Sequence, residues 1–138
     1  MTLIKLYLIV LLVVIPLSAM GQLTYPEKDG DKVCYNLQIE IRESYVSGIC
    51  IMVNNDGLIM SSIVNEFGVS MIDFTYSENK NKVKIRSIIE SLNRWYVKRL
   101  IKRSLRGMLK AMKSGDTEYI DTKNKIRYIF TLNNGTQG

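Results

Sequence analysis

The chain has no histidine among its 138 residues. This absence excludes Ser–His–Asp and Cys–His catalytic arrangements and any metal site built on imidazole. The phosphate-binding patterns G-x-x-x-x-G-K-[ST] and G-x-G-x-x-G are also missing. We therefore expect no cofactor and no metal, and a protein that is not an enzyme.

Cysteine is scarce, with only Cys34 and Cys50. Two isolated cysteines are too few for a zinc site. If residues 34–41 and 48–53 form a hairpin that turns near residues 43–45, Cys34 lies opposite Val53 rather than Cys50. This register argues against a disulfide, because bridged Cα atoms must lie within about 7 Å. An oxidising compartment would still permit one, so the pairing stays open.

Charge is nearly absent from the start of the chain, where Lys5 is the only charged residue before Glu27. An apolar run of 12 residues, 6–17, precedes the small residues Ala19 and Gly21. Such a run is short for a membrane span, which needs roughly 20 residues, and fits a secretory signal cut before Gln22. The sequence thus predicts a signal peptide over 1–21 and a periplasmic or secreted protein, with an uncleaved anchor as the alternative.

Acidic residues are scarce between residues 88 and 113, where Glu90 stands against eight basic residues. A solubilising surface usually mixes both signs, so this bias favours an anionic partner. Exported proteins rarely meet nucleic acid, so we expect none; a lipid headgroup or membrane surface is the leading partner, and a solvated face is the alternative. The candidate contacts are Lys98, Lys102, Arg103 and Arg106.

Alternating or β-branched apolar residues predict strands separated by polar turns. The Asn54–Gly57 stretch is a strong hairpin signal, because Asp-Gly supplies the positive φ angles of a tight turn. The predicted strands are 34–41, 46–53, 58–64, 69–76, 82–86, 118–121 and 126–132.

The apolar period changes to steps of three and four from about residue 87 to 112, which predicts an amphipathic helix. Ser87 and Glu90 match a capping box at its start. Gly115 is a plausible stop, and Gly107 could bend or end the helix early.

These elements predict an α+β domain over 34–132, after a flexible entry segment over 22–33 and before a disordered tail over 133–138. The expected architecture is a curved antiparallel sheet with one long helix on one face, an incomplete half-barrel. A ligand cavity between sheet and helix would be lined by Leu37, Ile51, Phe74, Leu92 and Trp95, with ordinary core packing as the alternative for each.

Glu66 and Asp73 are the best carboxylate pair for glycosidase-type chemistry. Glu66, however, falls in the predicted turn at Asn65–Gly68, and Asp73 falls in the next strand. We interpret both as solvated acids rather than as a catalytic pair.

The segments Ser47-Gly48, Asn65-Glu66-Phe67-Gly68, Asp73-Phe74 and Leu92-Asn93-Arg94 carry a resemblance. In this order they resemble a group of small exported proteins and lipoproteins of Bacteroidetes-type bacteria. The layout is more distantly similar to the half-barrel of the lipoprotein-localisation (Lol-type) carriers. That similarity implies a curved sheet closed by helices over a cavity for acyl chains.

Two functions follow as hypotheses. The first is a non-enzymatic periplasmic binding or carrier protein for a lipid-like or lipoprotein ligand. The alternative is a structural or interaction module that docks on a protein partner of the cell envelope.

Overall fold

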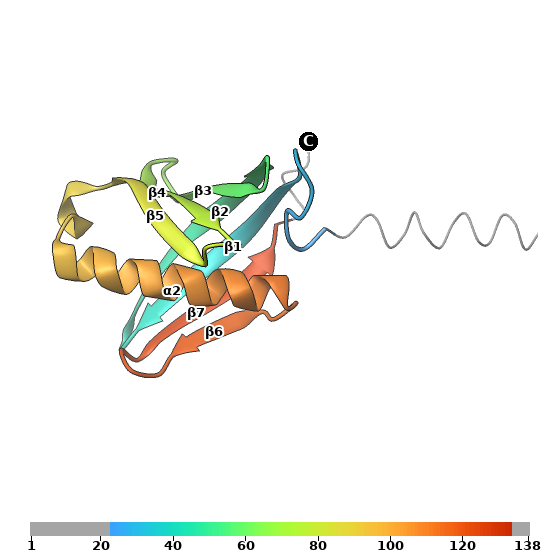
Figure 1. The fold of residues 1–138 in the computed structure, drawn as a ribbon. Coiled ribbons are helices and arrows are strands. Elements are labelled where there is room, and N and C mark those ends of the chain that lie inside the picture. The colour runs from blue at the N-terminus through green and yellow to red at the C-terminus, as the bar shows by residue number, and fades with distance from the viewer. Residues whose placement is uncertain (1–22, 134–138) are drawn as a thin grey trace, which may run out of the picture.

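In the computed structural model, which describes residues 23–133, a curled antiparallel sheet wraps around one long helix (Figure 1). The elements are β1 (Lys32–Ile41), β2 (Ser44–Asn55), β3 (Leu58–Asn65), β4 (Ser70–Ser77), β5 (Lys82–Ile88), the 3₁₀ turn η1 (Glu90–Leu92), α2 (Trp95–Lys113), β6 (Glu118–Asp121) and β7 (Ile126–Leu132). The expected signal segment 1–21 and residues 134–138 of the expected tail lie outside the described residues. Within 23–133, no helix has the length and hydropathy of a membrane span.

The sheet has seven strands in the order β5-β4-β3-β2-β1-β7-β6, and every neighbouring pair is antiparallel. β1 to β5 follow one another as adjacent strands. α2 then carries the chain from one edge of the sheet to the other and contacts both edge strands, β5 and β6. The predicted fold class, an α+β incomplete half-barrel with one helix on its face, is confirmed.

The core lies between the concave face of the sheet and the buried stripe of α2. Leu105, Met108, Leu109 and Met112 of the helix are buried there. The sheet contributes alternate residues of each strand, as expected for side chains that point to opposite faces in turn. The fully or nearly fully buried sheet residues include Tyr35, Leu37, Cys50, Met52, Ile59, Phe74 and Phe130.

Both cysteines are free. They lie on the neighbouring strands β1 and β2 but are not opposite each other. Cys34 is opposite Ile51, and Cys50 is opposite Tyr35. The predicted pairing of Cys34 with Val53 was therefore wrong by two residues, because the hairpin turns at Arg42–Glu43, before the expected position. Tyr35 points into the core, so its neighbour Cys34 points to the outer face and away from Cys50.

The helix begins later than the sequence indicated. Ser87 pairs with Asp73 as part of β5, and the Ile89 amide donates to the Met71 carbonyl, so this backbone belongs to the sheet. The predicted capping box at Ser87 was wrong: α2 starts at Trp95, and its N-cap residue Arg94 makes no side-chain capping bond.

Of the two glycines that could end the helix, only one does so. α2 continues through Gly107 to Lys113, so Gly107 does not end it. Gly115, at φ 86°, follows the helix, and the amides of Gly115 and Asp116 donate to the carbonyls of Met112 and Ala111. These two bonds form a Schellman motif, so the predicted stop is confirmed.

The segment before β1, which we expected to be flexible, is packed against the sheet. The Tyr25 side chain is buried in the core, and Pro26 is also buried. The Asn54 amide group donates from Nδ2 to the carbonyl oxygens of Pro26 at 2.8 Å and Glu27 at 3.1 Å. Its Oδ1 accepts from the Gly57 amide at 2.9 Å, so one buried side chain joins this segment to the β2–β3 turn.

Candidate functional site

An apolar cavity of about 210 Å³ lies between the concave face of the sheet and the first half of α2. Among its lining residues only Ser47 and Tyr128 carry polar side-chain atoms. An apolar cavity of this kind suits an apolar occupant. The lining consists of Leu37, Ile39, Ile41, Val46, Ser47, Gly48, Ile63, Met71, Ile72, Leu92, Val97, Leu100, Ile101, Ile126 and Tyr128.

Two of the five residues expected in the cavity, Leu37 and Leu92, line it. Phe74 is buried on the same face of the sheet but is not part of the lining. Ile51 lies on the opposite face, because its neighbours Cys50 and Met52 point into the core. Trp95 is 73% exposed on the outside of the helix, so the structure places Ile51 and Trp95 outside the cavity.

Three residues of α2 also line the cavity, namely Val97, Leu100 and Ile101. None of them was predicted as a cavity residue from the sequence. Their spacing of three and four residues places them on one face of α2. The apolar residues that predicted an amphipathic helix over 87–112 included Leu100 and Ile101 but not Val97. Val97 could have been predicted from the sequence, because Val97, Ile101 and Leu105 follow one another at a spacing of four residues.

Tyr128 is the one cavity residue with a shifted acid–base equilibrium. Burial raises the pKa of its hydroxyl to about 12, against a smaller lowering from nearby Ser104. The phenol is therefore neutral at physiological pH. Its hydroxyl group is polar but brings no charge to the mainly apolar lining.

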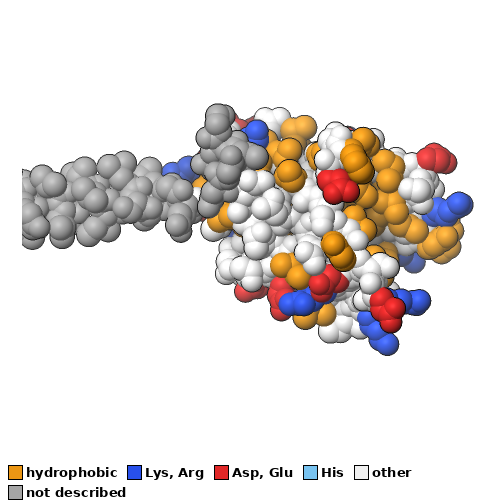
Figure 2. Space-filling model, turned by 180° about the vertical axis from the view of Figure 1, so that it is seen from behind, with side chains coloured by type: hydrophobic (Ala, Val, Ile, Leu, Met, Phe, Trp, Pro, Cys, Tyr) orange, Lys and Arg blue, Asp and Glu red, His pale blue; other side chains and the backbone are white. Residues whose placement is uncertain are grey.

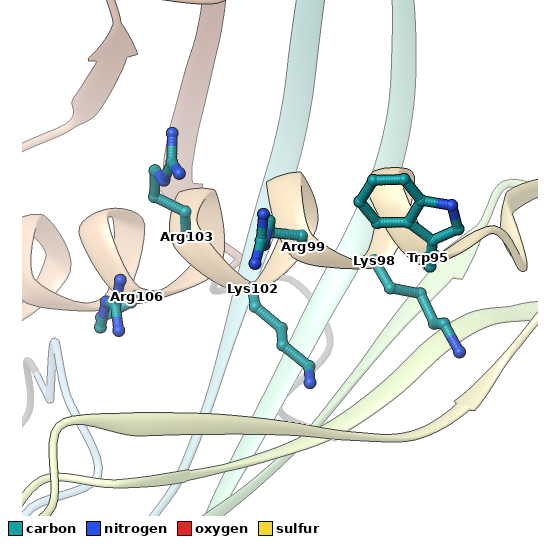
Figure 3. A pocket seen from close by; sticks show the side chains of 6 residues that line it. All are labelled: Trp95, Lys98, Arg99, Lys102, Arg103 and Arg106. Carbon is teal, nitrogen blue, oxygen red and sulfur yellow. The ribbon is translucent and has the colours of Figure 1, made fainter.

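Basic side chains cover the outer face of α2 beside Trp95 and surround an open hollow (Figure 3). We call this set the basic flank: Lys98, Arg99, Lys102, Arg103 and Arg106. The four predicted anionic contacts are brought together here, and Arg99 joins them. No member of the flank forms an ion pair with any described residue. The flank is thus a concentration of positive charge without close ion pairs, although Arg103 lies near enough to Asp121 to act on it electrostatically.

The two acids considered for catalysis lie in different surroundings. Glu66 is exposed in the β3–β4 turn, where the Asn65 Oδ1 accepts from the amides of Phe67 and Val69. Asp73 accepts hydrogen bonds from the hydroxyls of Ser62 and Ser70, each at 2.6 Å. Among residues 23–133 no cluster of three or more potential metal ligands occurs.

The fold and the cavity are supported by the structure of this chain alone. No protein-family model, no curated protein and no solved structure matches the chain.

Proposed function

We propose that the protein is a non-enzymatic binding or carrier protein for a lipid-like or lipoprotein ligand, acting in the periplasm or outside the cell. The observation that carries the proposal is the apolar cavity between sheet and helix. Its wall offers aliphatic side chains and one neutral phenol, which suit a hydrocarbon chain and do not suit a charged substrate.

The size of the cavity limits what it can hold. At about 210 Å³ it is smaller than the roughly 300–1,000 Å³ of pockets that enclose whole small-molecule ligands. We therefore assign it to the end of one acyl chain, with the remainder of the ligand at the opening. Ile41 and Val46 line the cavity and are also partly exposed, so they mark this opening.

The test measures chain binding by the protein from Gln22 onward, which contains every element of the described fold. A fluorescent fatty acid is bound and then displaced by saturated fatty acids of increasing length. Val97→Phe, which fills the cavity from the helix, is expected to weaken binding about tenfold or more, as the loss of an apolar pocket predicts. Lys110→Phe, an exposed change on the same helix, is the control and should bind as wild type.

Native mass spectrometry after incubation with a bacterial lipid extract provides the second readout. A protein that stays empty and takes up no fatty acid would refute the proposal. Equal binding by wild type and Val97→Phe would place the ligand elsewhere.

The alternative function, docking on a protein of the cell envelope, draws on the two edge strands. β5 and β6 each have one neighbour, so each has a backbone edge that does not pair within the sheet. A pull-down from envelope extract distinguishes the functions: a stoichiometric protein partner without bound lipid supports docking.

A further inference from the structure

Exposed apolar side chains gather at one end of the half-barrel. Within the described residues ten large hydrophobic side chains are exposed, and seven of them come from three segments. Ile41, Tyr45 and Val46 flank the β1–β2 turn, Phe67 and Val69 belong to the β3–β4 turn, and Trp95 and Tyr96 begin α2. We call these seven the apolar end.

Strand pairing places the β1–β2 turn, the β3–β4 turn and the end of β5, from which the chain enters α2, at the same end of the sheet. Ile41 pairs with Ser44 at the β1–β2 turn, and Gly48 pairs with Asn65 at the β3–β4 turn. Ile72 pairs with Ile88, after which the chain enters η1 and α2. Figure 2 shows orange side chains gathered at the end of the molecule that faces away from the grey segment.

The degree of exposure is too high for residues that serve the core. Phe67 is 82% exposed, Trp95 73% and Tyr45 68%. The Trp95 and Tyr96 rings contact each other edge to face, with centroids 5.7 Å apart. Three exposed aromatic side chains at one end of the half-barrel favour a contact surface over scattered apolar residues.

The basic flank begins one helical turn after Trp95. Its residues lie beyond the first turn of α2, where the helix dipole has little effect, so helix stability gives no reason for so many cations there. The first turn of α2 has no acidic residue, and its N-cap is Arg94. The cations therefore suit a negatively charged partner next to the apolar end.

Charges at the apolar end limit how deep that contact can go. Arg42 and Glu43 form the β1–β2 turn, Glu66 lies in the β3–β4 turn, and Glu90 and Arg94 precede α2. Ionised side chains of this kind stay at headgroup level, where tryptophan and tyrosine are also enriched. The combination fits a bilayer interface and not its hydrocarbon centre.

We propose that the apolar end and the basic flank together form a docking surface for an anionic lipid bilayer. Tyr45, Phe67 and Trp95 enter the interface, and the basic flank contacts anionic headgroups. Because Ile41 and Val46 belong to the apolar end and also line the cavity, docking turns the cavity opening toward the membrane. Docking does not require an occupied cavity, so it is tested separately from ligand binding.

Trp95 is the only tryptophan in the chain and reports directly on its own environment. The protein from Gln22 onward is titrated with vesicles of phosphatidylcholine alone or with phosphatidylglycerol added. With anionic vesicles we expect a blue shift of Trp95 emission, quenching by brominated acyl chains, and weakening of binding by salt. Neutral vesicles should bind much less.

Paired variants separate the two parts of the surface. Lys98→Gln/Lys102→Gln should weaken binding to anionic vesicles about tenfold or more, whereas Lys28→Gln/Lys32→Gln, near the β2–β3 turn at the other end of the sheet, should not. Phe67→Ser should reduce binding and the Trp95 shift, whereas Met60→Ser on the outer face of the sheet should not. Each variant is tested only if it unfolds as wild type does.

Three results would overturn the proposal. The first is no binding to anionic vesicles. The second is binding without a change in Trp95 emission, or an equal loss of vesicle binding in the control variants. Either of these would place the contact on another face. The third is a Trp95 shift that depends on protein concentration without lipid, which would assign the surface to a second copy of the chain.

Discussion

Gly107 of α2 lies directly against the ring of Tyr119 of β6. A Cβ atom at position 107 would be 2.3 Å from Tyr119 Cζ and 2.6 Å from its hydroxyl oxygen. The absence of a side chain at Gly107 therefore lets the helix approach the edge strand β6. Tyr119 in turn stacks in a tilted arrangement with Tyr128 of β7, with centroids 5.9 Å apart.

Gly107→Ala is expected to destabilise the protein by about 1–3 kcal/mol, the usual cost of overpacking. This loss should outweigh the gain of about 1 kcal/mol that alanine brings to a helix interior. Urea denaturation measures the change. In a Tyr119→Ala background the same substitution should become neutral or stabilising, and an equal loss in both backgrounds would contradict the contact.

Asn54→Ala is expected to cost about 1–3 kcal/mol, because it removes three hydrogen bonds and leaves the carbonyl of buried Pro26 without its donor. Asn55→Ala is the matched control: Asn55 is exposed, and its side chain reaches only the Met60 sulfur at 3.5 Å. The two variants are compared by thermal unfolding and by proteolysis of the segment before β1. Similar stabilities would show that Asn54 does not hold this segment.

The Glu78–Lys113 ion pair, at 2.8 Å, makes stability depend on acid pH. Burial works against ionisation of Glu78, but the hydrogen bond and the positive charge of Lys113 outweigh it, so the pKa of Glu78 is lowered. A lowered pKa stabilises the fold above the unfolded value of about 4.3, and this contribution is lost as pH falls through the folded value.

We expect the free energy of unfolding to decrease below about pH 5, and Glu78→Gln to lack this part of the decrease. Its size should be at most about 1 kcal/mol, because both side chains are partly exposed. Chemical denaturation from pH 3 to 7 measures it. Identical pH profiles for wild type and variant would exclude the contribution.

The two thiols are expected to react at very different rates. Cys50 is fully buried, and burial raises the pKa of its thiol to about 11 despite its contact with Ser61. Cys34 is partly exposed on the outer face. A thiol reagent should modify one cysteine quickly in the native protein and both in denaturant. A denatured, unreduced sample with no free thiol would instead reveal a disulfide.

The strands that alternate clearly could be predicted from the sequence. In β1, Tyr35 and Leu37 are the inward residues, as the pattern indicates. In β2 the run from Ile49 to Val53 is apolar on both faces, so composition alone does not show which residues face the helix. Ile51 was therefore assigned to the wrong face.

The site was less predictable because it depends on where α2 begins. Ser87 and Glu90 have the local signature of a helix start, but sheet pairing of Ser87 and Ile88 prevails over it. The delayed start leaves Trp95 outside the core. The basic flank could be read from composition, whereas the cavity depends on how the helix rests on the curled sheet.

The crossover of α2 from one edge of the sheet to the other has a consequence for folding. β1 to β5 pair through short hairpins, but β7 must reach β1 from the far end of the chain; Asn133 bonds Asn36 across 97 residues. Because distant contacts form slowly, we expect the five-strand meander to assemble first and β6–β7 to dock last. Until β7 arrives, β1 is an open edge, and this interval is when the chain is most exposed to aggregation.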